Sequence, residues 1–450
     1  MLLYPKDTIA AIATAPGKGG VGVIRISGQN LTDFAKNISG QSAPLPRVAL
    51  YTDFLDQDKH PIDNGLLLYF PNPNSFTGED VIELQGHGGP VVLHMLLKRC
   101  QELGARLAEP GEFSKRAFLN DKMDLAQAES VADLIDASSQ SAARLALRSL
   151  KGAFSTQIHA LVEQLISLRV LVEATLDFPE EDIDFLEAAD AKGQLTTLQT
   201  ELVQLLANAQ QGSILREGIQ VVLLGAPNVG KSSLLNALAG DDIAIVTDIA
   251  GTTRDVVKEN ITLDGVPLHI IDTAGLRQSD DTIEQIGMQR TEHAVNQADI
   301  VLILVDPEEG LNSYTQEVLN NLPTTLKKIE IHNKIDLRAQ EPEYIERIDQ
   351  PDLLKISAKT GQGLNLLKDI LLKEVGWQGE AEGLFLARER HITALKEAQE
   401  ELNWAEGCYQ QIELFAEHLR RTQEALSRIT GEFTADDLLG SIFSSFCIGK

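Results

Sequence analysis

The spacing of hydrophobic residues changes along the chain and divides it into stretches of different character. Up to about residue 120, short apolar runs at 20–27, 66–70 and 81–84 alternate with turn signals rich in glycine, proline and asparagine. Short runs between such turns are typical of strands, and the longer apolar stretch at 91–103 is typical of a helix. This part of the sequence therefore predicts a small α/β domain.

Between about 122 and 210, hydrophobic residues recur every three or four positions, which is the period of an amphipathic helix. The same period returns after about residue 380, on segments with long charged faces. The recurring positions are Ile158, Leu161, Leu165, Leu168 and Val172, then Leu195, Leu198, Leu202 and Leu205, and later Ile392, Leu395, Leu402, Leu414 and Leu426. Both stretches are predicted to be helical.

The segment between the two helical stretches has a third pattern. Short β-rich runs alternate there with helical segments, at 219–224, 268–271, 300–305, 328–331 and 353–356. This alternation predicts a parallel sheet built from βαβ units.

We therefore expect an N-terminal α/β domain at 1–120, a first helical part at 121–213, a parallel-sheet α/β domain at 214–378 and a second helical part at 379–450. The second helical part is short for an independent hydrophobic core, so we favour an α/β domain inserted into a single helical domain. Four independent domains in a row are the alternative.

Composition and charge narrow the class of protein. The 450 residues include 39 Lys and Arg against 66 Asp and Glu, a net charge of −27, and three cysteines too scattered for a disulfide framework or a zinc site. The chain has neither an apolar run long enough to span a membrane nor a signal peptide, so we expect a cytoplasmic protein. Its acidity opposes nucleic-acid binding unless a local basic patch or a basic partner supplies cations.

A phosphate-binding motif stands at the start of the predicted sheet. Residues 225–233 read GAPNVGKSS, and this GxxxxGKS sequence directly follows a predicted strand and leads into a helical pattern. Its glycines let successive backbone N–H groups point at a phosphate, and the helix N-terminus adds a favourable dipole. Lys231 can reach the β- and γ-phosphates, and the Ser232 hydroxyl suits Mg²⁺.

Four further elements follow in order. Thr253, in the sequence TTRD, offers a hydroxyl to Mg²⁺, and DTAG at 272–275 ends a predicted strand beside the metal and the γ-phosphate. In NKID at 333–336, Asp336 can accept two hydrogen bonds from guanine, Lys334 can lie over the ring, and SAK at 357–359 can donate to the guanine oxygen. Each motif lies at the carboxyl end of a predicted strand, where α/β folds bind ligands. Together they predict a Ras-like P-loop GTPase domain.

The predicted GTP-binding residues are Asn228, Val229, Gly230, Lys231, Ser232, Ser233, Thr247, Asp248, Ile249, Ala250, Gly251, Thr252, Thr253, Asp272, Thr273, Ala274, Gly275, Asn333, Lys334, Asp336, Ser357, Ala358 and Lys359.

One position departs from the Ras-like pattern. The glutamine that orients the attacking water in Ras-like proteins follows Asp-x-x-Gly, and here that residue is Leu276. Either hydrolysis is slow or another group orients the water. Asp280, Asp281 and Glu284 lie downstream, and by position alone each is as well explained as a solvated loop acid.

Four stretches outside these motifs resemble one family. They are DTI with GGVGVIRISG near the N-terminus, PNSFTGEDVIELQGHGGP at 73–90, PGEFSKRAFLNDKMDLAQAE at 110–129, and FCIGK at 446–450. In these the whole chain resembles the tRNA-modification GTPase family MnmE, also called TrmE. The resemblance implies an N-terminal folate-binding α/β domain that dimerises, an all-α helical domain, and a G domain inserted into it.

The resemblance also implies ligands and roles. Reduced folate (5-formyl- or methylene-tetrahydrofolate) is expected at Arg25, Glu83, Lys122 and Lys450, and Glu284 matches the position assigned to water activation. A potassium ion takes the place of an arginine finger in the family, with matching ligands at Asn228, Thr247, Ile249 and Thr252, while Ser232 and Thr253 take Mg²⁺. Family accounts place a nucleophile at Cys447, but an isolated thiol is more often inert.

The family works with a flavoprotein partner, MnmG (GidA), in a heterotetramer or a larger complex. Together they install a carboxymethylaminomethyl or aminomethyl group at C5 of the wobble uridine (position 34) of certain tRNAs, with a folate one-carbon unit. FAD and NADH belong to the partner.

Two other interpretations stay open at this point. A regulatory, RNA-binding ribosome-assembly GTPase would share the G-domain motifs, but a basic RNA-binding domain would follow, and residues after 380 are acidic and helical. Alternatively, the N-terminal domain is a structural dimerisation module, with no ligand at Arg25, Glu83 and Lys122.

Overall fold

The structure is a computed structural model whose chain divides into two compact units. One unit comprises Met1–Ala132, Ser149–Ala191 and Trp404–Lys450, and the other comprises Asp133–Arg148 and Lys192–Asn403. The structure describes residues 7–41, 44–177, 187, 189–226, 228–239, 258–272, 298–306, 308, 310–311, 313–323, 326–348, 350–379, 383–432 and 436–449.

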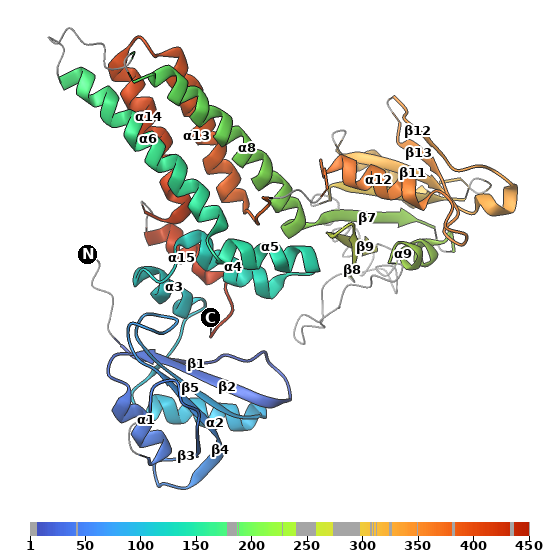
Figure 1. The fold of residues 1–450 in the computed structure, drawn as a ribbon. Coiled ribbons are helices and arrows are strands. Elements are labelled where there is room, and N and C mark those ends of the chain that lie inside the picture. Colours follow the sequence, from blue (N-terminus) through green and yellow to red (C-terminus); the bar gives the residue numbers. More distant parts are fainter. Residues whose placement is uncertain are drawn as a thin grey trace. The chain divides into compact units, whose positions relative to one another are not determined.

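The first unit contains a six-stranded sheet with the strand order β3-β4-β5-β2-β1-β6, antiparallel except for the β1–β6 pair (Figure 1). Its strands are β1 (Ile9–Ile12), β2 (Gly19–Gly28), β3 (Leu50–Leu55), β4 (Pro61–Phe70), β5 (Asp80–Gly88) and β6 (Arg106–Leu107). Helices α1 (Thr32–Ser39) and α2 (Pro90–Glu102) bury Phe34, Ile38 and Leu96 in one cluster with Ile24 and Ile82 of the sheet. Both helices therefore cover the same sheet face.

Helices complete this unit, and segments far apart in sequence pack together in it. They are α3 (Glu112–Leu119), the first two turns of α4 (Leu125–Asp136), α6 (Ala153–Asp177), α14 (Ile412–Thr430) and α15 (Asp436–Ser444). Helices α6 and α14 lie along each other, and Leu125 and Ala128 of α4 share a buried cluster with Phe443 and Phe446. The last turn of α4, from Asp133, belongs to the second unit.

The second unit contains a seven-stranded sheet with the order β12-β13-β11-β10-β7-β9-β8. The strands are β7 (Ile219–Gly225), β8 (Lys258–Leu263), β9 (Val266–Asp272), β10 (Ile300–Val305), β11 (Lys327–His332), β12 (Glu343–Ile345) and β13 (Asp352–Lys355). Successive residues of β7 belong to different buried clusters. Val221 and Leu223 are in one cluster, and Val222 and Leu224 are in the other. The sheet is therefore covered on both faces, as expected for parallel strands.

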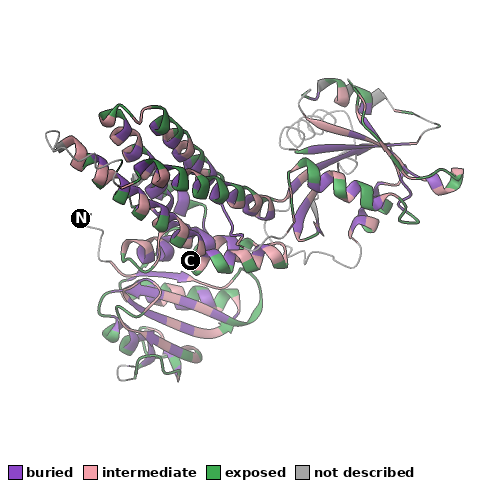
Figure 2. Ribbon diagram, turned by 45° about the horizontal axis from the view of Figure 1, so that its top comes forward, coloured by how far each residue is buried: buried purple, intermediate pink, exposed green. Residues whose placement is uncertain are grey.

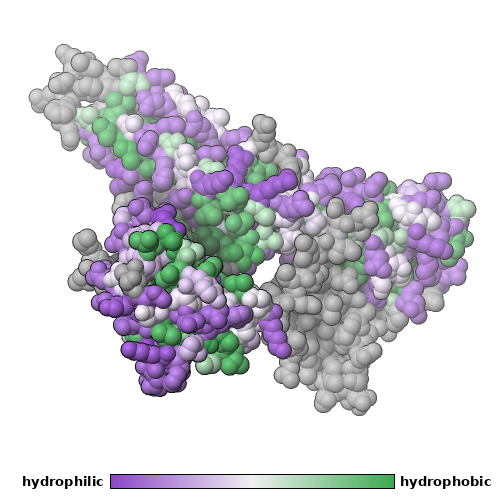
Figure 3. All heavy atoms as spheres, turned by 60° about the horizontal axis from the view of Figure 1, so that its bottom comes forward, coloured by the Kyte–Doolittle hydropathy of each residue, from purple (hydrophilic) through white to green (hydrophobic). Residues whose placement is uncertain are grey.

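Helices α9 (Lys231–Ala239), α11 (Ser313–Asn321), α12 (Leu364–Glu374) and the 3-10 turn η2 (Ile335–Arg338) accompany this sheet. The same unit holds most of α5 (Gln140–Leu150), nearly all of α8 (Ala191–Glu217) and most of α13 (Glu389–Gly407). Figure 2 shows both buried and exposed residues along the long helices, in agreement with the amphipathic period in the sequence. Hydrophilic residues are spread over the face shown in Figure 3, and in the described residues no helix is long and apolar enough to cross a membrane.

The fold class is confirmed, and every strand predicted after residue 214 is present within one or two residues of its expected ends. One detail differs: the sheet is not wholly parallel, because its edge strands β8 and β12 run antiparallel to their neighbours. Asp264 and Gly265 have φ of 48° and 84° and form the two-residue turn between β8 and β9, which is the geometry of a tight hairpin. The predicted boundaries after residues 120, 213 and 378 stay predictions.

Candidate nucleotide-binding site

The phosphate loop leaves β7 at Gly225 and enters α9 at Lys231. Gly225 and Gly230 have φ of 151° and 104°, where a side chain would be strained, and Asn228 has φ of 62°. The Lys231 side chain folds back over the loop, and its Nζ donates hydrogen bonds to the carbonyls of Gly225 (2.8 Å) and Ala226 (2.9 Å). Ser232 is exposed at the first turn of α9. A cation thus lies at the place where a triphosphate would bind.

A buried asparagine joins the phosphate loop to the predicted base-binding loops. Asn333 is 6% exposed; its Nδ2 donates to the Val229 carbonyl (3.2 Å), and its Oδ1 accepts from the Ala358 N–H (3.0 Å). Nearby, the Ser357 hydroxyl donates to Asp336 Oδ1 (2.6 Å) and so fixes the carboxylate that is predicted to accept from guanine. The three loops therefore form one connected edge.

The sheet explains why these loops meet. Strands β7, β9, β10, β11 and β13 are parallel, so the residues that follow them lie at one edge. The backbone of Asp272 ends β9 at that edge. Asp306 follows β10 there, and its carboxylate lies 3.6 Å from Lys334 Nζ and 3.2 Å from Arg338 Nη2. The sequence interpretation did not include Asp306, although an acid directly after a buried strand was a usable signal.

Some of the predicted site residues lie outside the described part of the chain. They are Thr247, Asp248, Ile249, Ala250, Gly251, Thr252, Thr253, Thr273, Ala274, Gly275, Leu276, Asp280, Asp281, Glu284 and Lys450. The predicted catalytic acid and three of the four predicted potassium ligands are among them.

Of the residues predicted to bind folate, Arg25, Glu83 and Lys122 are described in the first unit, and Arg25 and Glu83 form an ion pair. Arg25 on β2 faces Glu83 on β5 in the sheet register, and its Nε and Nη2 lie 3.0 and 2.9 Å from Glu83 Oε1. Arg25 Nη1 also donates to the Gly449 carbonyl at 3.4 Å, which brings the C-terminal segment to this pair. Lys122 packs its aliphatic carbons near Gly78, and Cys447 is exposed. Sequence spacing gave no signal for the Gly449 contact.

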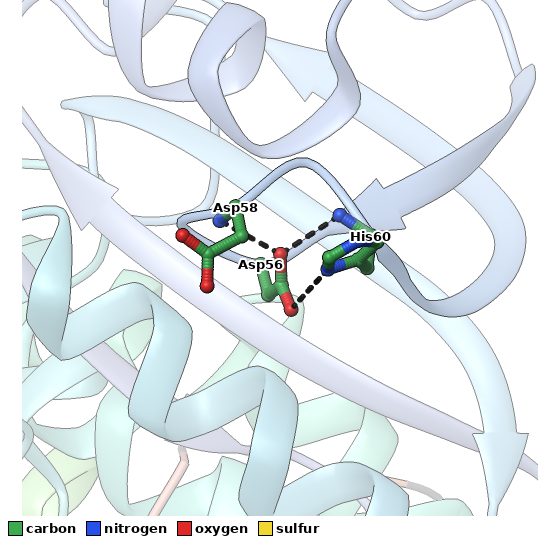
Figure 4. Close-up of side chains that lie close together, drawn as sticks. All are labelled: Asp56, Asp58 and His60. Carbon is green, nitrogen blue, oxygen red and sulfur yellow. Dashed lines mark hydrogen bonds and ion pairs between the residues drawn. The ribbon is translucent and has the colours of Figure 1, made fainter.

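A third group of polar side chains lies in the turn between β3 and β4. Asp56, Asp58 and His60 offer three possible metal ligands that lie within 4.8 Å of one another (Figure 4). Asp56 Oδ1 accepts hydrogen bonds from the backbone N–H groups of Asp58 (2.9 Å) and His60 (2.8 Å). These bonds close the turn and account for the cluster, so we assign it no ligand.

The strand–loop–helix around Lys231 and the Asn333–Asp336 and Ser357–Lys359 loops at the same sheet edge define a P-loop GTPase, an enzyme that hydrolyses GTP. Two family descriptions match the chain: "GTP-binding protein TrmE N-terminus" at residues 8–122 and "MnmE helical domain" at residues 125–447. The chain belongs to the MnmE family of tRNA modification GTPases.

Individual relatives support the same family assignment. A tRNA modification GTPase MnmE of Neisseria meningitidis serogroup A is 69% identical over 444 residues, which are 98% of this chain and 99% of the relative. The protein of the same name from Chromobacterium violaceum is 64% identical over 449 residues and the full length of both chains. Among solved structures, the G domain of the FeoB iron transporter of T. maritima is 26% identical over 35% of this chain and 98% of its own length, with a TM-score of 0.27.

Proposed function

We propose that this protein is a potassium-activated GTPase that acts with the flavoprotein MnmG to modify C5 of the wobble uridine of certain tRNAs, using a reduced-folate one-carbon unit. The observation that carries the GTPase part is the Asn333 side chain, which hydrogen-bonds both to the phosphate loop and to the base-binding loop. These hydrogen bonds support a single site in which the phosphate loop and the base-binding loop are held together at one edge of the sheet.

The described residues have distinct tasks in this proposal. Lys231 exchanges its bonds to the Gly225 and Ala226 carbonyls for bonds to the β- and γ-phosphates when GTP binds. Asp336, held by Ser357, accepts from the N1–H and the amine of guanine, which adenine cannot offer. Ser232 presents a hydroxyl oxygen, a donor that Mg²⁺ prefers, together with Thr253.

Potassium fits the chemistry of the loop. Asn228 supplies an oxygen ligand, with Thr247, Ile249 and Thr252 as its proposed partners, and Leu276 cannot orient water as a glutamine does. A bound K⁺ would supply positive charge beside the β–γ bridge. Glu284 is the proposed group that activates the attacking water.

The proposed function also includes a reduced-folate site in the first unit. Glu83 offers a carboxylate to the 2-aminopyrimidinone edge of a reduced folate, and Arg25, Lys122 and Lys450 offer cations to its glutamate tail. The protein acts as a homodimer in a heterotetramer or larger complex with MnmG, which holds FAD and NADH. Because the chain carries a net charge of −27, most of the tRNA contact falls to that partner.

The potassium role is tested by steady-state GTP hydrolysis in KCl and in NaCl at equal ionic strength. We expect kcat to fall at least about tenfold in NaCl, because charge stabilisation at the β–γ bridge is lost. In KCl, Glu284→Ala should lower kcat by at least about tenfold and leave GTP affinity nearly unchanged, while Asp281→Ala is the matched control with a normal rate. Equal rates in both salts would contradict the potassium role.

A further inference from the structure

A carboxylate outside the sequence motifs lies at the nucleotide-binding edge of the seven-stranded sheet. Asp306 directly follows the buried strand β10, which lies between β7 and β11 in the strand order. In the register of these parallel strands Leu304 pairs with Gly225, where the phosphate loop begins, and on the other side β11 leads into the Asn333–Asp336 loop. Asp306 therefore stands where a nucleotide bound to both loops would cross from its phosphates to its base.

The turn after β10 and a neighbouring arginine hold the carboxylate of Asp306 in place. Its Oδ1 accepts from the Glu308 N–H at 3.1 Å and from Arg338 Nη2 at 3.2 Å. The Gly310 N–H donates to the Asp306 carbonyl at 2.9 Å and closes the same turn. The hydrogen bond from the Glu308 N–H and the charge of nearby cations lower the pKa of Asp306, so the group is a fixed anion at neutral pH.

The other oxygen of this carboxylate faces the lysine of the NKID motif. Lys334 Nζ lies 3.6 Å from Asp306 Oδ2. The backbone of Lys334 is in the left-handed region, with φ of 69°, and its N–H donates to Asn333 Oδ1 at 2.8 Å. The lysine is therefore attached at both ends, by its backbone to the loop after β11 and by its ammonium to the loop after β10. Its four-carbon stem runs from one loop to the other.

A stem that is held at both ends is suited to cover the face of a flat ring. An unattached lysine side chain has many rotamers, and ordering it over a ring costs entropy whenever a nucleotide binds. The ion pair with Asp306 removes part of this cost, because the stem is ordered before the nucleotide arrives. The edge of the base is the task of Asp336, which Ser357 holds. Different residues thus serve the face and the edge of the ring.

We propose that Asp306 is a positioning residue of the GTP site, which holds the Lys334 ammonium so that the lysine stem covers the face of the guanine ring. It adds to the affinity for the base and leaves the choice between bases to Asp336. The inference rests on the proposed function, because it adds a residue to the GTP site proposed there. The Lys334 and Asp306 side chains are 41% and 22% exposed, so water screens the pair and its effect is modest.

The test uses the full-length chain with the variant Asp306→Asn, which removes the charge and keeps an oxygen for the Glu308 N–H. Competition titration against a fluorescent GDP should show a GDP affinity about threefold to fivefold weaker than that of the wild type. Inosine diphosphate, which lacks the amine that faces Asp336, should lose the same factor, so the ratio of the two affinities stays at its wild-type value. A distorted base-binding loop would instead lower this ratio, because the contacts on the guanine edge would be disturbed.

A double-mutant cycle with Lys334→Met shows whether the effect passes through the lysine. Methionine keeps an apolar stem but has no ammonium for Asp306 to hold. Lys334→Met alone should weaken GDP binding, and the addition of Asp306→Asn should then change the affinity by less than about twofold.

Glu308→Gln is the matched control, because it replaces a carboxylate by an amide in the same turn. The Glu308 carboxylate pairs with Arg338 at 3.4 Å, whereas Lys334 pairs with Asp306. Glu308→Gln should therefore bind GDP and inosine diphosphate as the wild type does.

A wild-type affinity for GDP in Asp306→Asn would overturn the proposal, and so would a changed ratio of the GDP and inosine diphosphate affinities. An equal loss from Asp306→Asn with and without Lys334→Met would overturn it, because the carboxylate would then act by another route. A loss of the same size in Glu308→Gln would assign the effect to the total charge of the turn. Failure of the proposed function is separate, since it would appear as wild-type protein that binds GDP no better than ADP.

Discussion

At the scale of the residue, the proposed preference for guanine depends on one carboxylate. Asp336 accepts a hydrogen bond from the Ser357 hydroxyl at 2.6 Å, and this bond fixes the carboxylate that we propose accepts from two donors of guanine. The sequence predicted that Asp336 and Ser357 belong to the site, because NKID and SAK follow predicted strands. The hydrogen bond between them was not, because it depends on the pairing of β11 with β13.

We expect Asp336→Asn to weaken GDP binding by about 100-fold or more, because an amide presents a donor to a donor. Xanthosine diphosphate, which carries an acceptor in place of the guanine amine, should gain affinity in the same variant. Calorimetric titration of both nucleotides checks this, with Asp264→Asn in the β8–β9 turn as a control. Parallel loss of both nucleotides would show that Asp336 has a structural task instead.

At the scale of secondary-structure elements, the phosphate loop and the loop after β11 meet because both follow parallel strands of one sheet. A Cβ on Gly230 would lie 2.2 Å from Asn333 Nδ2, so the phosphate loop and the loop after β11 are in direct contact. The sequence predicted each loop from its own motif. It could not predict that Asn333 ties them together, because that contact spans 104 residues.

Gly230→Ala should therefore weaken GDP binding at least about tenfold and lower the free energy of unfolding by about 1–3 kcal/mol, since φ of 104° strains any side chain. The comparison is Gly310→Ala, whose φ is 71° but whose Cβ meets nothing within 4 Å. If both variants bind GDP equally well, the contact with Asn333 does not matter. Titration with a fluorescent nucleotide measures the GDP affinity, and urea unfolding measures the free energy of unfolding.

Ion pairs fasten helix α3 to the N-terminal sheet, and they make its stability depend on pH. Burial raises the pKa of Glu112 and of Asp7, but hydrogen bonds and charge from Arg106 and Arg116 outweigh it, so both pKa values lie below their usual range. Arg106 Nη2 and Arg116 Nη2 lie 2.7 and 3.0 Å from Glu112 Oε1. Groups with lowered pKa values stabilise the fold above their unfolded pKa.

We accordingly expect the first unit to keep its stability from neutral pH down to roughly pH 4.5 and to lose it as the pH falls through the folded pKa values. Glu112→Gln should cost about 1–3 kcal/mol at pH 7 and flatten this dependence. Urea unfolding between pH 3 and pH 7 measures both. An equally steep acid transition in Glu112→Gln would assign the dependence to other carboxylates.

At the scale of the whole chain, residues far apart in the sequence meet in the first unit. Gly449 contacts Arg25 across 424 residues, and the cluster of Phe443 and Phe446 with α4 holds this segment in place. The apolar period predicted the helices around it. It could not predict their partners, because periodicity marks the buried side of a helix and not the surface it packs against.

Under the proposed function, removal of residues 447–450 should weaken 5-formyl-tetrahydrofolate binding at least about tenfold, because Arg25 loses the Gly449 carbonyl and the proposed ligand Lys450 is removed. GTP hydrolysis by the truncated protein should be unchanged. Cys447→Ser, which keeps the backbone, should bind as the wild type does. Unaltered folate affinity in the truncated protein would place the ligand elsewhere, and no affinity in the wild type would favour a purely structural N-terminal domain.

The exposure of Cys447 has a practical consequence. Of the three thiols, Cys100 is buried, and burial raises its pKa to about 12, while Cys408 is only partly exposed. A maleimide dye offered in limiting amount will therefore attach first at Cys447, two residues from the carbonyl that meets Arg25. The native chain can thus carry a fluorophore close to the Arg25–Gly449 contact without engineering, and its emission would follow in real time how that end of the molecule responds to added ligands.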